Sequence, residues 1–316
     1  MSDALILTVV LMGTVVSVQV VGHGTSGRAR RERQRGADRA LAWFRRVEAV
    51  CSRFDASSEL RQLSTHIGTA VPTSPMLFEA VQFALAVAAE THGAFDPTVG
   101  ERMESRGFNR DYRTGADVRS EVSAAGPVSY RDVELDPDTR SITLHRPLLL
   151  DLGAVAKGLA VDMAARELTP FVNFAIDAGG DLYLGGRNAE DAPWSVGIRH
   201  PRDATQLLDT LRVSDRAVCT SGDYERVAPI MAVAAESAPG PDGAQVSRDH
   251  HIIDPTTGSA AQHAASVTVV ASSAMVADAL ATAAFVLGPM DGIALLERHH
   301  VQGVVITPSL ERFATL

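Results

Sequence analysis

The first twenty-one residues constrain the fold most, because they could be either a membrane-directed segment or part of the core. The segment is apolar, but it has no basic start, contains Asp3 and is interrupted by Gly13 and Gln19. It reaches the length of about 20 residues that a membrane span needs only when its polar members are counted. Val16, Val18 and Val20 alternate with Val15, Ser17 and Gln19, which is the period of a half-buried strand. We therefore predict core strands over residues 5–21, no membrane span and a cytoplasmic protein.

The composition is that of a soluble globular chain and excludes disordered or collagen-like structure. Of the 316 residues, 46% are hydrophobic and 21% are charged, and the net charge is −9. An acidic chain has no general attraction for nucleic acid or anionic membranes, so any site for an anion must be local. We expect one domain over residues 1–316, with a flexible insertion near residues 234–249, where Pro and Gly gather. The two cysteines, Cys51 and Cys219, have no metal spacing and are predicted to be buried.

Helix and strand patterns are mixed along the chain without a strict β-α-β alternation, which favours an α+β fold. Apolar residues at spacings of three and four predict a helix that includes Leu41–Cys51, and the basic run Arg28–Arg35 is interpreted as its solvated start rather than a partner site. Ser74 and Pro75 are typical of another helix start. A strand is predicted over residues 171–176, and a helix over residues 274–287 that ends at a Gly-Pro pair.

The first pattern that points to chemistry is a carboxylate and a hydroxyl on one helix. Asp278 and Thr282 are four residues apart, so in a helix they lie on the same face. Two hard oxygen ligands of this kind suit Mg²⁺, which also takes waters and substrate phosphate oxygens. An ordinary Asp and a Thr bonded back to its own helix would give the same pattern, so both interpretations stay open.

Three small-residue turns follow apolar strands and could bring backbone close to a ligand. The turn at 151–158 contains Asp151 and Lys157, which could bind ribose or adenine donors and phosphate respectively, although it is no P-loop. Gly179 and Gly180 allow close approach of a ligand, and Ser221 lies in a similar polar turn. Each of these turns could also be purely structural.

Histidine offers a further candidate. His251 precedes a short apolar step and an Asp-Pro turn, where an imidazole could act as a base near neutral pH. A satisfied structural histidine is the alternative.

Taken together, these segments resemble the ApbE family of flavin transferases. The resemblance runs in order through nearly the whole chain. It is carried by residues 11–18, 54–60, 93–100, 151–158, 178–181, 220–226, 251–255 and 277–282.

The resemblance implies an α+β fold of ApbE type (T-fold-like), with FAD bound between two lobes. It implies a Mg²⁺-dependent enzyme that transfers the FMN half of FAD to a Thr or Ser hydroxyl of an acceptor protein and releases AMP. Asp278 and Thr282 fall at Mg²⁺ positions, with the Ala154 carbonyl as third ligand. We expect His251 to accept the hydroxyl proton and Lys157 to steady phosphate charge. The expected FAD-binding residues are Met12, Phe54, Ala94, Phe95, Asp96, Asp151, Lys157, Gly179, Gly180, Ser221 and Ile253.

Two other functions use the same residues and remain alternatives. A Mg²⁺-dependent FAD pyrophosphatase would replace the acceptor hydroxyl with water and give FMN and AMP. A non-catalytic FAD-binding protein would be expected to lack the metal pair, yet Asp278 and Thr282 are both present. A redox flavoenzyme is disfavoured because the chain has no G-x-G-x-x-G fingerprint.

Overall fold

A large antiparallel sheet organises the structure, which is a computed structural model describing residues 3–22, 26–225 and 249–316. The strand order is β1-β2-β6-β7-β10-β11-β12-β13, and every neighbouring pair is antiparallel. Residues 234–248 of the predicted insertion lie outside the described residues. The strands are β1 Asp3–Leu11, β2 Thr14–Gly22, β6 Phe174–Ala178, β7 Leu182–Gly185, β10 Arg216–Gly222, β11 Ser266–Ala271, β12 Gln302–Ile306 and β13 Arg312–Ala314.

The N-terminal segment forms strands β1 and β2 of the large sheet, as predicted, and the structure pairs them as a hairpin. Met12 and Gly13 make the two-residue turn, with φ angles of 53° and 73°. Such mirror-image turns match the twist of the strands and favour glycine. Val16 is completely buried, whereas its neighbour Val15 is 55% exposed, so one face of the hairpin packs on the core. The turn places Met12 at the end of the hairpin rather than within a strand.

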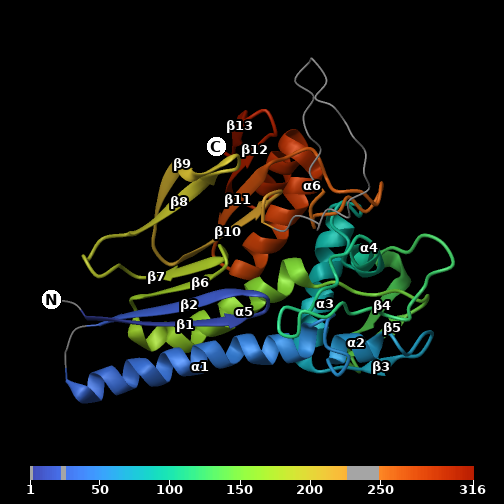
Figure 1. Cartoon of the computed structure of the whole chain (residues 1–316), viewed down its shortest axis with the longest axis horizontal. Helices are drawn as coiled ribbons and strands as arrows, with labels where there is room; N and C mark the ends of the chain where they lie inside the picture. The colour runs from blue at the N-terminus through green and yellow to red at the C-terminus, as the bar shows by residue number, and fades with distance from the viewer. Residues whose placement is uncertain (1–2, 23–25, 226–248) are drawn as a thin grey trace.

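Three helices pack side by side against the sheet and bury most of the core (Figure 1). Helix α1 (Gly27–Cys51) contacts β1 and β2, α5 (Gly153–Leu168) contacts β6 and β7, and α6 (Ala274–Arg298) contacts β10, β11 and β12. Exposed arginines begin α1 as predicted, except that Arg33 is only 3% exposed. Both cysteines are buried, as predicted.

The remaining elements lie beside the three-helix layer or extend from the sheet. They are α2 (Glu59–Leu63), α3 (Pro75–Glu90), α4 (Gly100–Ser105), the small sheet β3-β5-β4 (Val71–Pro72, Ser141–Leu144, Val133–Asp136), the ribbon β8–β9 (Trp194–His200, Asp203–Val213) and the 3₁₀ turns η1 (Pro97–Val99), η2 (Tyr130–Asp132) and η3 (Thr169–Phe171). Ser74 caps α3 by accepting a hydrogen bond from the Leu77 amide at 3.2 Å, as its sequence predicts. The α+β class is confirmed.

The predicted helix end at residue 287 is confirmed as a break in α6, whereas one predicted strand boundary is wrong. Gly288 has a non-helical φ of 80°, and a second helical stretch that was not predicted runs from Pro289 to Arg298. The strand expected over residues 171–176 begins only at Phe174, because η3 occupies the preceding residues.

Helix α6 is long and apolar enough to cross a membrane, but it packs on the large sheet and forms part of the protein core. Its most apolar window is 61% buried inside the protein. Burial against protein accounts for its composition without a bilayer.

Helices α5 and α6 touch at Gly158, and this contact sets the spacing of the site described below. A Cβ atom at Gly158 would lie 2.5 Å from the Ala274 carbonyl oxygen and 2.5 Å from Met275 Cα. Both are backbone atoms, so the helices would have to separate. We expect Gly158→Ala to lower the free energy of unfolding by about 1–3 kcal/mol, the usual cost of overpacking. Denaturant unfolding measures this. Gly68→Ala, where no atom lies within 4 Å but φ is +71°, separates backbone strain from packing.

Candidate active site

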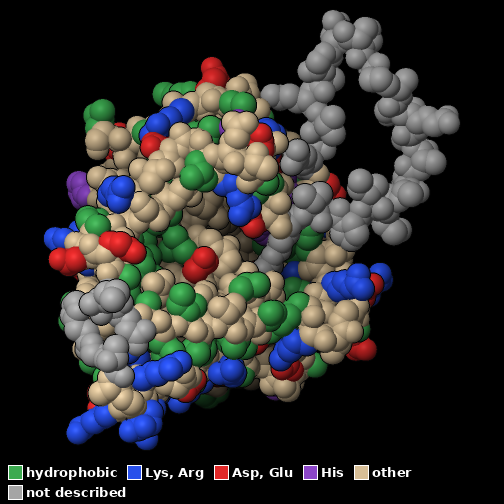
Figure 2. All heavy atoms as spheres, turned by 60° about the vertical axis from the view of Figure 1, so that its left-hand side comes forward, with side chains coloured by type: hydrophobic (Ala, Val, Ile, Leu, Met, Phe, Trp, Pro, Cys, Tyr) green, Lys and Arg blue, Asp and Glu red, His purple; other side chains and the backbone are tan. Residues whose placement is uncertain are grey.

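A pocket of about 520 Å³ opens between the large sheet with its helices and the loops around α4. The face in Figure 2 is hollowed near its centre. Nearly all the predicted site residues line this pocket. They are Met12, Phe54, Ala94, Phe95, Asp96, Asp151, Ala154, Lys157, Gly179, Ser221, His251, Ile253, Asp278 and Thr282.

Gly180 is the predicted site residue that the structure does not place in the pocket lining. Its amide donates to Asp177 Oδ1 at 2.9 Å, and its φ of 98° belongs to a tight turn. Its part in binding stays a prediction. The neighbouring Gly179 lies so close to Thr14 that a Cβ would come within 2.0 Å of the Thr14 hydroxyl oxygen. Gly179 therefore lets the β6–β7 turn pack against the start of β2.

Lys157 lies between two buried carboxylates at the centre of the pocket. It comes from the second turn of α5, and its Nζ contacts Asp181 Oδ2 and lies 3.1 Å from Asp278 Oδ2. Asp181 directly follows the tandem glycine, and Asp278 comes from α6. The pKa of Asp278 is raised to about 7, mainly by burial and also by the charge of Asp181, while Lys157 and the Gly158 amide oppose the shift. One ammonium thus serves two carboxylates, and the cluster favours an additional cation.

Thr282 lies one helical turn beyond Asp278 on the same side of α6, as the spacing predicts. Its Oγ1 is 3.0 Å from Ser221 Oγ on β10. Ala154 in the first turn of α5 lines the same pocket. No group of three or more His, Cys, Asp or Glu side chains suited to a metal occurs in residues 3–22, 26–225 and 249–316. A cation here would therefore use mixed oxygens, namely a carboxylate, a hydroxyl and a carbonyl, which is chemistry that suits Mg²⁺.

Asp96 is a buried carboxylate that already holds the backbone around it. Its Oδ1 accepts hydrogen bonds from the Thr98 amide and hydroxyl at 2.9 and 2.8 Å, and its Oδ2 accepts from the Tyr130 amide at 3.0 Å. Burial raises the pKa of Asp96, and these hydrogen bonds oppose the shift. The carboxylate therefore holds the backbone of residues 94–99, which forms one wall of the pocket.

The two adjacent histidines have different environments. His250 is 1% exposed; its Nε2 lies 2.9 Å from the Ala261 carbonyl oxygen, and its Nδ1 accepts from the Ile252 amide at 3.2 Å. This pattern requires the neutral imidazole with its proton on Nε2. His251 is half-buried, lines the pocket and makes an edge contact with Phe108. The structure therefore separates a structural histidine from one with access to a ligand.

His250 predicts a pH dependence of stability. Burial lowers the pKa of His250 below its ordinary value of 6.5. Below that pH the unfolded chain binds a proton that the folded chain refuses, so stability is lost as pH falls from about 6.5 towards the folded pKa. We expect the wild type to lose up to about 1.4 kcal/mol per pH unit more than His250→Gln over this window. Denaturant unfolding of both proteins between pH 7.5 and 5 measures the difference; parallel curves would contradict the prediction.

The pocket lining includes residues that were not predicted from the sequence, among them Arg53, Phe108 and Asp181. Arg53 adjoins the predicted Phe54, and Asp181 adjoins Gly180, so proximity to a predicted motif was the available signal. Phe108 lies in a loop that carries no motif.

Comparison with known proteins identifies the family to which the sequence is similar. The sequence model of the ApbE family matches residues 12–306. A relative from Treponema pallidum named FAD:protein FMN transferase is 32% identical and is matched over 90% of this chain and 79% of its own length. One of the same name from Klebsiella pneumoniae is 28% identical over 99% of this chain and 87% of its own.

Solved structures show the same fold. The ApbE protein of Thermotoga maritima superposes with a TM-score of 0.80 and 28% identity, over 99% of this chain and 97% of that one. The flavin transferase ApbE of Vibrio cholerae gives 0.79 and 26%, with the same coverage.

Proposed function

This chain belongs to the ApbE family, and from that membership we infer its reaction. It is an FAD:protein FMN transferase, an enzyme that moves the FMN half of FAD onto an acceptor protein. The structural observation that supports this reaction is the pocket, where residues from distant sequence motifs meet.

We propose that Mg²⁺ is required and that Asp278, Thr282 and the Ala154 carbonyl hold it. The support is the excess negative charge of the cluster, in which Asp181 and Asp278 share the ammonium of Lys157. When bound, the ion would supply charge neutralisation at the pyrophosphate of FAD. Lys157 can turn from the carboxylates towards a phosphate oxygen, because a lysine stem is flexible and its Nζ is already at the pocket surface.

The proposed transfer needs a base for the acceptor hydroxyl. The hydroxyl oxygen attacks the phosphorus of the FMN half, the bond from that phosphorus to the bridging oxygen breaks, and AMP leaves. His251 accepts the proton that the hydroxyl loses. The acceptor is proposed to present Thr or Ser, because their hydroxyls supply the required nucleophile. A cytoplasmic location is also proposed.

The reaction is tested with FAD, Mg²⁺ and a lysate of the source cells, followed by in-gel flavin fluorescence. A fluorescent protein band that requires both the enzyme and Mg²⁺ is the expected result. Rapid AMP release without any acceptor would instead favour the FAD pyrophosphatase. Tight FAD binding with neither labelling nor AMP release would favour a flavin-binding protein.

A further inference from the structure

Arg53 is a charged residue that is almost fully buried at the pocket wall. Its side chain is 5% exposed. Its Nε donates to Asp151 Oδ2 and its Nη2 to the Phe108 carbonyl oxygen, and its guanidinium lies 4.2 Å above the centre of the Phe54 ring. Burying a guanidinium is costly unless its donors are used. In Arg53, the contacts to Asp151, Phe108 and Phe54 offset this cost.

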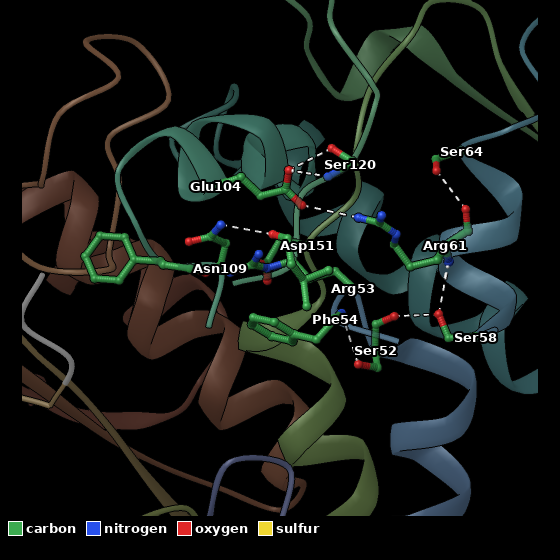
Figure 3. Close-up of polar contacts among 12 residues, drawn as sticks. Ser52, Arg53, Phe54, Ser58, Arg61, Ser64, Glu104, Asn109, Ser120 and Asp151 are labelled. Atoms are coloured by element: carbon green, nitrogen blue, oxygen red, sulfur yellow. Dashed lines mark hydrogen bonds and ion pairs between the residues drawn. The ribbon is translucent and has the colours of Figure 1, made fainter. Parts of the chain in front are cut away.

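These contacts join three segments that are distant in the sequence (Figure 3). Arg53 follows the end of α1, Phe108 lies in the loop after α4, and Asp151 precedes α5. The other carboxylate oxygen of Asp151 accepts from the Gly153 amide at 2.7 Å, at the start of α5. Arg53 therefore fixes the start of the helix that carries Lys157.

One nitrogen of the guanidinium makes no hydrogen bond. Nη1 of Arg53 is buried and has no hydrogen-bond partner among the described residues. A buried donor without a hydrogen bond destabilises the folded protein, and an acceptor atom of a bound ligand would remove this cost. Arg53, Phe54, Phe108 and Asp151 all line the pocket, so a ligand that shifts this wall on binding can supply that atom.

We propose that Arg53 is a specificity and positioning residue for FAD, through a hydrogen bond from Nη1 to an acceptor atom of one of its heterocyclic rings. This inference rests on the proposed function. A ring fits better than a phosphate, because the rings of Phe54 and Phe108 line the same wall and because Asp151 already neutralises the guanidinium. By pairing Asp151, Arg53 also keeps a carboxylate from repelling the anionic nucleotide.

The test measures the dissociation constant of FAD, with and without Mg²⁺, by flavin fluorescence and without an acceptor. Wild-type binding is established first; its absence would refute the proposed function rather than the role of Arg53. The main variant is R53M/D151N, which removes the ion pair without leaving a buried charge. Because Asp151 is itself an expected FAD-binding residue, the reference is D151N alone, and we expect R53M/D151N to bind FAD about 10- to 100-fold more weakly than D151N, the loss of one hydrogen bond from a charged donor. R53K keeps the charge but not the planar fork, so we expect it to bind FAD weakly and also to lose stability, because one ammonium cannot reproduce the contacts to both Asp151 and Phe108.

The matched control is the ion pair of Arg61 and Glu104, which is similarly buried and labelled in Figure 3. Its side chains are 11% and 9% exposed, and Arg61 lines a separate hollow. R61M/E104Q should lose stability but bind FAD normally. FAD binding by R53M/D151N as tight as that of D151N, or equal weakening in the control, would overturn the proposal. Competition by FMN and by AMP then identifies the ring: weakening of one competitor alone supports the proposal, and weakening of neither refutes it.

Discussion

Asp278→Asn is expected to reduce FMN transfer by at least about a thousandfold, because the Mg²⁺ ion proposed at this position would supply several kcal/mol of charge stabilisation. Asn is nearly isosteric but provides one neutral oxygen in place of a carboxylate. The variant should still fold, since burial and Asp181 already disfavour the charge that the substitution removes. Steady-state transfer at a series of Mg²⁺ concentrations, together with thermal unfolding, measures both expectations.

Thr282 supplies the matched pair of variants for this prediction. Thr282→Ser keeps the hydroxyl that lies 3.0 Å from Ser221 Oγ, whereas Thr282→Val removes it at nearly constant volume. The Ser variant should keep the Mg²⁺ requirement of the wild type, and the Val variant should need more Mg²⁺ for half-maximal transfer. Mg²⁺-dependent transfer by Asp278→Asn at the wild-type rate would show that the ion is held elsewhere.

The sequence predicted those parts of the fold that local physics decides. The alternation in residues 15–20 is enough to predict a half-buried strand there, because one face of β2 is buried and the other is more exposed. The pairing of β1 with β2 was not predicted. The spacing of Asp278 and Thr282 is enough to place both on one side of α6. The kink at Gly288 was predicted only as a helix end, since a Gly-Pro pair stops a helix locally and only tertiary packing makes it resume.

The site could be predicted from the sequence where a motif carries its own residues, and not where partners come from distant segments. Lys157 was found within its turn, but its contact with Asp181 depends on how α5 packs against the β6–β7 turn. Arg53 gives no sequence signal of burial, because arginine is usually exposed. Its role appears only when Phe108 and Asp151 are brought to it by the fold.

His251→Ala is expected to leave the dissociation constant of FAD unchanged and to reduce transfer by about 10²- to 10⁴-fold, the usual contribution of a positioned general base. The reason is that His251 lines the pocket beside Phe108, where it can reach an incoming hydroxyl without contributing charge to the Asp278 cluster. Single-turnover transfer with saturating FAD separates this chemical defect from weak binding. Added imidazole should restore part of the rate, since a small base can occupy the space that the alanine leaves.

His250→Gln is the control for this experiment, because the two histidines are neighbours with different environments. His250 is held by Ala261 and Ile252 away from the ligand, so its substitution should lower stability while leaving transfer at neutral pH unchanged. A base role for His251 requires the opposite pattern in its own variant. Transfer by His251→Ala at the wild-type rate would refute that role, and a loss that imidazole does not relieve, accompanied by weak FAD binding, would instead make His251 a part of the pocket wall.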